Sequence, residues 1–179
     1  GLPLELVYPE ALHDLQEIEE TGAGYVENAR LKAVTLAIRH GLWTLADDTG
    51  LEVEALGGAP GVRSARLVGP QGTDEDRRAR LLDLLEGHPR PWRARFRCVV
   101  ALAGPHGEIE SAVGECAGEI IPEPRGHHGF GYDPIFLVDG QERTMAELPL
   151  EAKNHLSHRA RALRSLMPAL RRRLGLPLE

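Results

Sequence analysis

Cysteine is scarce in this chain, and a long hydrophobic stretch is absent. The two cysteines, Cys98 and Cys116, are too few and too widely spaced to form a zinc site on their own. Both fall inside predicted strands, which indicates reduced thiols in the core of a cytoplasmic protein. No apolar run is long enough to span a bilayer, and no secretory signal is present. We therefore expect neither a disulfide-stapled protein nor a membrane partner.

Aromatic residues are also few, and the charge balance is acidic. Aromatics make up 4% of the 179 residues, and the formal net charge is −6, which disfavours a general nucleic-acid-binding surface. The hydrophobic share of 42% and the charged share of 27% are typical of a globular protein. A single domain spanning residues 1–179 is the organisation we expect.

The central feature of the sequence is an acidic pair that follows an apolar run. Residues 42–46 are mostly apolar, Asp47 and Asp48 follow, and Thr49 and Gly50 have the composition of a turn. This pattern predicts a buried strand that ends at two carboxylates, near the strand end where α/β sheets bind ligands. Oxygen ligands of this kind suit Mg²⁺ with a phosphate substrate. An ordinary polar turn after a strand remains the alternative.

Periodicity predicts an α/β fold with a mixed sheet. Apolar spacing indicates helices over 25–40, from Thr73 to Gly87, and from Ser157 to about residue 174, where Pro168 should kink or break the helix. Alternation predicts strands over 93–103 and 108–121, joined by a hairpin turn, and a short strand over 135–138. Residues 4–8 are a candidate outer strand, and the arginines at 77, 78 and 80 are expected to be solvated.

Three groups of residues could carry chemistry, and each also has an ordinary structural explanation. Carboxylates near a lysine could hold Mg²⁺ and a triphosphate. Glycines beside aromatics could let a planar base stack, and cations at a helix start could bind carbonyl oxygens or anions. A polar turn, core aromatics and a capped helix are the respective alternatives. The groups are Glu20, Asp47 and Asp48 with Lys32; Phe130, Gly131, Tyr132 and Asp133; and Lys153 with Ser157, His158 and Arg159.

Short motifs follow one another along nearly the whole chain. They are Glu19-Glu20-Thr21-Gly22, Glu27-Asn28-Ala29-Arg30-Leu31-Lys32-Ala33, Ala46-Asp47-Asp48-Thr49-Gly50-Leu51, Leu56-Gly57-Gly58-Ala59-Pro60-Gly61, Ser64-Ala65-Arg66, Phe130-Gly131-Tyr132-Asp133-Pro134, Glu151-Ala152-Lys153 and Ser157-His158-Arg159. Each motif is weak alone. Taken in order, the set resembles the ITPase, or HAM1-like, family of non-canonical purine NTP pyrophosphatases.

The resemblance implies a two-lobed α/β fold. Helices would flank a long mixed sheet, the active-site cleft would lie between the lobes, and the protein would be a homodimer. It also implies hydrolysis of ITP, dITP or XTP to the nucleoside monophosphate and pyrophosphate. Glu20 and Asp48 would bind Mg²⁺, Asp48 would activate water, and Lys32 would offset phosphate charge. The substrate-binding residues would be Thr49, Phe130, Gly131, Tyr132, Asp133, Lys153, His158 and Arg159, of which Phe130 and Tyr132 would frame the base and the last four would read its edge.

One departure from the family pattern concerns the phosphates. The family opens with a strand and a Ser/Thr-x-Asn-x-x-Lys motif that grips the triphosphate, and no match to it occurs in this sequence, in which Gly1 aligns after it. A nucleotide-binding module or an inactive truncated form is therefore one alternative. A Maf-like nucleotide pyrophosphatase is another, and an aspartic protease, suggested by Asp48-Thr49-Gly50, is a third.

Overall fold

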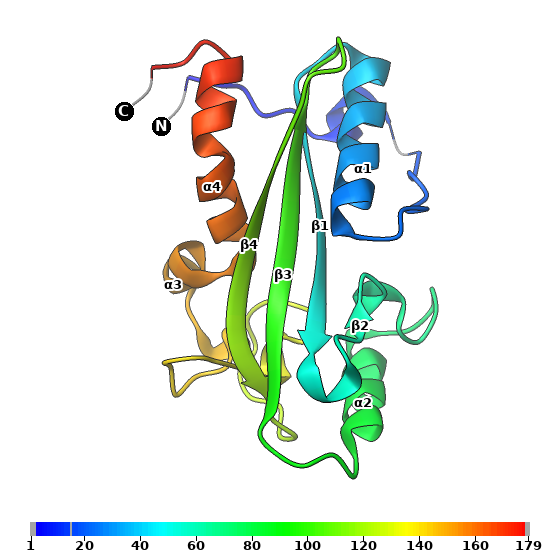
Figure 1. The fold of residues 1–179 in the computed structure, drawn as a ribbon, viewed down its shortest axis with the longest axis vertical. Coiled ribbons are helices and arrows are strands. Elements are labelled where there is room, and N and C mark those ends of the chain that lie inside the picture. Colours follow the sequence, from blue (N-terminus) through cyan, green and yellow to red (C-terminus); the bar gives the residue numbers. More distant parts are fainter. Residues whose placement is uncertain (1–2, 15, 178–179) are drawn as a thin grey trace.

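A five-stranded sheet forms the centre of the computed structural model, which describes residues 3–14 and 16–177 (Figure 1). Its strand order is β2-β1-β3-β4-β5, and each neighbouring pair is antiparallel. The strands are β1 (Thr44–Val53), β2 (Pro60–Gly61), β3 (Trp92–Ala103), β4 (Ile109–Ile120) and β5 (Phe136–Val138).

The α/β class is confirmed, but the expectation of a mixed sheet is wrong for the residues that are described. β3 and β4 form a hairpin, and β1 returns beside β3 in the opposite direction, so no two neighbouring strands run in parallel. The outer strand expected over 4–8 is also absent, because that segment has no strand partner.

β1 does not end at the acidic pair. It continues through Asp47, Asp48 and Thr49, and pairs with β3 from Thr44, opposite Ala103, to Val53, opposite Ala94. The predicted turn at Thr49 and Gly50 is therefore wrong, because β3 supplies a ladder partner at every position. Gly50 is instead a point of close approach, where a Cβ would collide with the carbonyl oxygen of Gly61 on β2.

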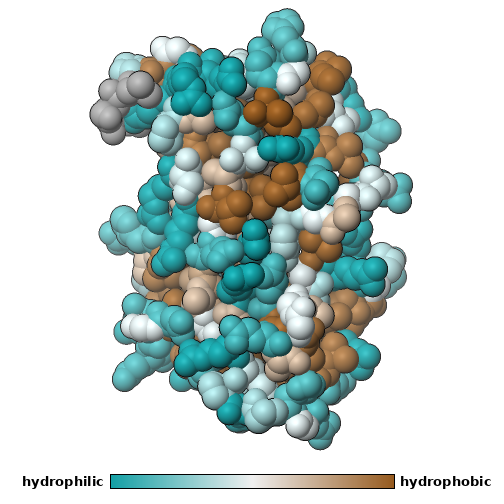
Figure 2. All heavy atoms as spheres, viewed as in Figure 1, coloured by the Kyte–Doolittle hydropathy of each residue, from teal (hydrophilic) through white to brown (hydrophobic). Residues whose placement is uncertain are grey.

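Two helices cover opposite faces of β3. Alternation along the strand sends Val99, Ala101 and Ala103 toward α1 (Tyr25–His40), and Cys98, Val100 and Leu102 toward α4 (His158–Arg173). Figure 1 shows α1 and α4 on either side of the upper half of the sheet. On the side of the molecule that Figure 2 shows, hydrophobic residues gather where β3 and β4 pass between the two helices.

A second lobe surrounds the other half of the sheet, in the lower part of Figure 1. Its core joins β1 and β3 to α2 (Asp74–Leu85), to β5 and to the short 3-10 helices η4 (Asp133–Ile135) and η5 (Met145–Glu147). α3 (Leu150–Leu156) leads from this lobe back to α4. None of the helices formed by residues 3–14 and 16–177 is long and apolar enough to cross a membrane.

Helix caps agree with the sequence patterns. Thr73 and Asp76 form a capping box at α2, and the Ser157 side chain accepts a hydrogen bond from the backbone N–H of Ala160 at the start of α4. Pro168 does not break α4, because Leu166 and Leu170, on either side of it, are buried against the sheet.

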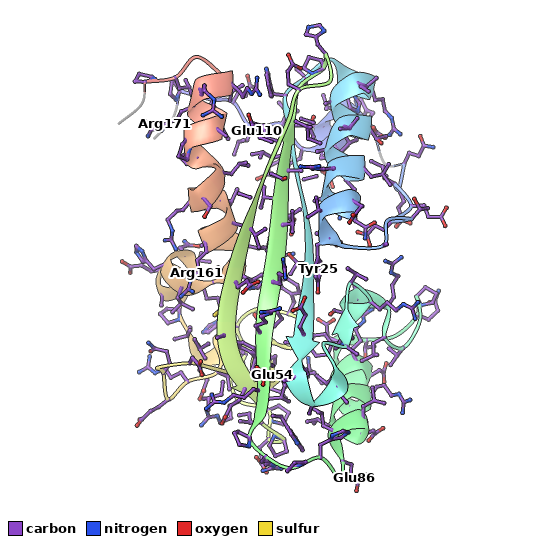
Figure 3. The ribbon with its side chains drawn as sticks, in the orientation of Figure 1. Tyr25, Glu54, Glu86, Glu110, Arg161 and Arg171 are labelled. Carbon is purple, nitrogen blue, oxygen red and sulfur yellow. The ribbon has the colours of Figure 1, made fainter. Side chains whose placement is uncertain are left out.

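Ion pairs fasten the far end of α4 to β4. Figure 3 places Glu110 at the end of the sheet that lies nearest the last turn of α4, where Arg171 is labelled. The Glu110 carboxylate pairs with Arg172 at 3.2 Å and with Arg173 at 2.8 Å. These cations at the helix C-terminus also complement the helix dipole.

Replacing Gly114 tests how closely β4 approaches α4. A Cβ at Gly114 would collide with backbone atoms of His158 and Ala162, so Gly114→Ala should force the helix away from the strand. We expect a loss of about 1–3 kcal/mol in the free energy of unfolding, measured by urea denaturation. Ala117→Ser, at an exposed position of the same strand, is the control and should change stability little. Equal stability of Gly114→Ala and the parent would contradict this packing.

Candidate functional site

A cavity of about 1000 Å³ lies between the two lobes. One wall comes from residues 49–51 of β1, another from the loop over 128–133, and a third from α3 and the first turns of α4. All eight residues expected to bind substrate line it, although they come from four separate parts of the chain. They are Thr49, Phe130, Gly131, Tyr132, Asp133, Lys153, His158 and Arg159.

Glu20, Lys32 and Asp48 form a second cluster and do not line this cavity. Asp48 pairs with Val99 and points toward α1, whereas Asp47 and Thr49 point toward the α4 face, because successive side chains of a strand alternate. The expectation that Asp47 and Asp48 serve one site together is therefore wrong. The residues that line the cavity and the cluster of Glu20, Lys32 and Asp48 therefore lie on opposite sides of β1, next to each other at Thr49.

The α1-side cluster is a pair of carboxylates bridged by an ammonium group. Lys32 Nζ lies 2.7 Å from Glu20 Oε1 and 3.8 Å from Asp48 Oδ1. Arg66 Nη2 lies 3.0 Å from Glu20 Oε2. Burial raises the pKa of Asp48, which is 6% exposed, while its hydrogen bond from Asn28 and the charge of Lys32 oppose that rise.

The donor set of this cluster fits Mg²⁺ that is shared with a substrate. No group of three or more His, Cys, Asp or Glu residues in the described segments could hold a metal ion by itself. Mg²⁺, however, is commonly bound by one or two carboxylates, with phosphate oxygens and water completing its shell. Lys32 already places a positive charge between Glu20 and Asp48.

Lys153 and Asp133 form an ion pair in the wall of the cavity. Lys153 Nζ lies 2.9 Å from Asp133 Oδ2 and donates a second hydrogen bond to the His128 carbonyl oxygen at 3.2 Å. Burial raises the pKa of Asp133, and the Lys153 ammonium opposes that rise. Gly129 makes the arrangement possible, because a Cβ there would collide with the Asp133 carboxylate.

Two residues of α2 hold the loop that carries Phe130. Asp74 Oδ2 accepts the Gly131 N–H at 2.7 Å, and Arg78 Nη1 donates to the Gly131 carbonyl oxygen at 2.8 Å. Arg77 pairs with Asp74 at 2.7 Å. The expectation that Arg77 and Arg78 are merely solvated is therefore wrong. The pair of Arg77 with Asp74 is a local one, three residues apart on α2. No local sequence signal indicates the contacts of Arg78 and Asp74 with Gly131, because these partners lie more than 50 residues apart.

The two aromatics of the loop have different surroundings. Tyr132 is 4% exposed, and its hydroxyl donates to the Ser64 carbonyl oxygen at 2.9 Å, so it anchors the loop in the second lobe. Phe130 is 63% exposed, and the Arg159 guanidinium lies 5.3 Å from its ring centroid. Of these two rings, that of Phe130 is therefore the exposed one, and Arg159 lies over it.

Asp47, which the resemblance left without a role, holds two of the predicted residues. Its Oδ2 atom accepts hydrogen bonds from Arg159 Nε at 3.1 Å and from Thr49 Oγ1 at 2.8 Å. Burial alone would raise the pKa of Asp47, but Arg159 and Thr49 together bring that pKa below its ordinary value. Asp47 is thus a stable anion that orients Arg159 and Thr49.

His158 is a buried polar side chain at the cavity wall. It is 6% exposed, its ring stacks on Phe96 with centroids 4.8 Å apart, and neither ring nitrogen has a hydrogen-bond partner among the described residues. Burial lowers the pKa of His158 to about 4. The ring is therefore neutral at pH 7, with one nitrogen able to donate and the other able to accept.

The buried His158 should make stability depend on pH. The folded chain keeps the ring neutral down to about pH 4, while the unfolded chain takes up a proton near its ordinary pKa of 6.5. The contribution of His158 to the free energy of unfolding is therefore fully present above pH 6.5. It falls by about 3 kcal/mol in all as the pH is lowered to 4.

Urea denaturation of the parent and of His158→Phe measures how far the free energy of unfolding drops between pH 7 and pH 4.5. We expect the drop in His158→Phe to be smaller than that in the parent by about 2–3 kcal/mol. His88→Gln, at an exposed position, should behave like the parent. Identical losses in His158→Phe and the parent would contradict the buried neutral ring.

Comparison with known proteins agrees with this geometry. Residues 3–169 match the Ham1 family. A protein of Desulforamulus reducens named dITP/XTP pyrophosphatase is 51% identical over 157 residues, which cover 87% of this chain and 78% of that protein. A dITP/XTP pyrophosphatase of Geobacter sulfurreducens is 51% identical over 91% of this chain and 82% of its own. The solved structure of a HAM1 protein from Coxiella burnetii superposes with a TM-score of 0.82 at 45% identity, covering 88% of this chain and 82% of the other. The chain belongs to the Ham1 family.

Proposed function

We propose that this protein hydrolyses non-canonical purine nucleoside triphosphates, such as ITP, dITP and XTP, to the nucleoside monophosphate and pyrophosphate. The observation that carries the proposal is the convergence of eight separate residues on one cavity that adjoins, across β1, the pair formed by Glu20 and Asp48. The similar proteins of two bacteria are named for this reaction.

The base would lie in the cavity, stacked on Phe130. An ammonium group has three N–H donors, and Lys153 uses two of them on Asp133 and on the His128 carbonyl oxygen. The third remains for the 6-oxo group that hypoxanthine and xanthine share. Adenine presents an amino group there, so its N–H would face the Lys153 donor and leave both unpaired.

The triphosphate would pass over β1 at Thr49 toward the second cluster. Lys32 would offset the phosphate charge, and Glu20 with Asp48 would hold Mg²⁺. The metal would supply charge neutralisation on the phosphate oxygens. Asp48 would take a proton from the attacking water, because its Oδ1 atom is directed toward this cluster.

Pyrophosphate release from ITP, XTP, GTP and ATP tests this function directly. We expect release from ITP and XTP with Mg²⁺, weak release from ATP and GTP, and none in EDTA. Guanine shares the 6-oxo group, so weak release from GTP requires that the cavity accommodate its 2-amino group poorly. Asp48→Asn, which keeps the shape but removes the base and the charge, should lower kcat by at least about 100-fold. Asp83→Asn, at an exposed position of α2, should leave it unchanged.

Release that persists in EDTA, or in Asp48→Asn, would contradict these roles. Binding of ITP without release would instead favour a nucleotide-binding module. The assay would then be repeated with a chain that carries the Ser/Thr-x-Asn-x-x-Lys motif at its N-terminus. Release by that longer chain would indicate an enzyme that needs the motif, and no release would indicate a nucleotide-binding module.

Lys153 should determine the preference for a 6-oxo base. Lys153→Met keeps most of the apolar stem but removes the donor, so kcat/KM for ITP should fall by about 10- to 100-fold while that for ATP changes less. Steady-state rates with both substrates measure the ratio. Glu151→Gln, at an exposed position of α3, is the matched control. An unchanged ITP-to-ATP ratio in Lys153→Met would remove Lys153 from base recognition.

We further propose that the protein acts as a homodimer in the cytoplasm. On the face opposite the core of the second lobe, β3 and β4 carry charges of both signs, including Arg93, Arg95 and Glu115. Val113, which is 41% exposed, lies on β4 near them. A two-fold interface must be self-complementary, and a face with arginines on β3 beside glutamates on β4 offers charges of both signs for such pairing.

A further inference from the structure

Asn28 connects the two carboxylates of the α1-side cluster. It lies in the first turn of α1 and is 0% exposed. Its Nδ2 donates to Asp48 Oδ2 at 3.0 Å, and its Oδ1 accepts the N–H of Gly22 at 2.8 Å. Gly22 lies two residues after Glu20. One buried carboxamide therefore holds both the strand that carries Asp48 and the segment that carries Glu20.

These hydrogen bonds also decide which oxygen of Asp48 faces the cluster. Oδ2 is occupied by Asn28, whereas Oδ1 accepts the Thr49 N–H at 3.1 Å and lies 3.8 Å from Lys32 Nζ. Oδ1 is thus the atom directed toward Lys32, on the side where the Lys32 ammonium meets Glu20.

We propose that Asn28 is a positioning residue, which sets the separation and orientation of Glu20 and Asp48 so that both direct an oxygen toward one cation. This inference rests on the proposed function, in which Glu20 and Asp48 hold Mg²⁺. Side chains that orient metal ligands, without touching the metal themselves, commonly change metal affinity or activity by 10- to 100-fold when they are removed.

The chemistry of the carboxamide suits both contacts. Asparagine has an N–H donor for a carboxylate and a carbonyl acceptor for a backbone N–H, and it carries no charge. Aspartate at this position would lack the donor and would place another negative charge beside Asp48. Leucine would leave the Gly22 N–H and Asp48 Oδ2 without their partners.

Two neighbouring glycines offer a matched test from the loop side. A Cβ at Gly22 would lie 2.5 Å from Asn28 Oδ1 and 2.6 Å from Glu27 Cβ, so Gly22→Ala must displace Asn28 or the loop. A Cβ at Gly24 would meet only the Glu27 side chain, whose nearest atom, Oε2, lies 2.9 Å away at its flexible end. Gly22→Ala should therefore disturb the connection, and Gly24→Ala should not.

The experiment compares the parent chain with Asn28→Ala, Gly22→Ala and Gly24→Ala, after thermal unfolding has shown that each is folded. Binding of Mn²⁺ in the presence of a non-hydrolysable ITP analogue, which supplies the phosphate ligands, is followed by the electron paramagnetic resonance signal of the free ion against a protein-free control. The values of kcat and KM for ITP are measured with saturating Mg²⁺. We expect Asn28→Ala and Gly22→Ala to weaken Mn²⁺ binding by at least about tenfold. We also expect them to lower kcat by a similar factor, with KM for ITP within about threefold of the parent.

Three results would overturn the inference. One is an Asn28→Ala chain that keeps the Mn²⁺ affinity and kcat of the parent, and another is an equal effect of Gly24→Ala and Gly22→Ala. The third is a parent that neither binds Mn²⁺ nor hydrolyses ITP. A parent that binds Mn²⁺ but does not hydrolyse ITP contradicts the proposed function alone, and the Mn²⁺ affinities of the variants then decide the role of Asn28.

Discussion

The pairing of β1 with β3 over ten residues is the constraint on which the rest of the molecule depends. Because the ladder holds β1 extended through the acidic pair, Asp48 is directed toward α1, and Asp47 and Thr49 toward α4. β3 lies between the same two helices, and its alternating small and apolar side chains fill both interfaces. Any shift of one residue in this register would exchange the two clusters between the faces.

Each carboxylate of the site has a cationic partner close to it. Glu20 lies between Lys32 and Arg66, Asp47 binds Arg159, and Asp133 binds Lys153. Lys32 and Lys153 are the two lysines in the sequence, and the other basic residues that contribute to the count of 21 are arginines. An ammonium is a compact charge with three donors, so it can serve a carboxylate and a further acceptor at once.

Local patterns were read correctly where the cause is local. The helix over 25–40, the capping box at Thr73 and the cap at Ser157 depend on neighbours within one turn, and the structure contains all three. The expected turn at Thr49 is wrong, and of the kink or break expected at Pro168 the break is wrong, because distant contacts outweigh local preference. The whole length of β1 pairs with β3, so the chain stays extended at Thr49. Buried leucines of α4 pack against the sheet on both sides of Pro168.

The sequence by itself determined the α/β class and the order of the motifs, because residue type and spacing along one chain carry that information. The eight residues expected to bind substrate came from the resemblance to the family, and the structure brings all of them to one cavity. Only the tertiary structure decided that Asp47 and Asp48 face opposite sides, that Arg78 holds Gly131, and that Asn28 joins Gly22 to Asp48. The bonds of Arg78 and Asp48 join atoms between 20 and 53 residues apart, and those distances are set by packing, which no local pattern encodes.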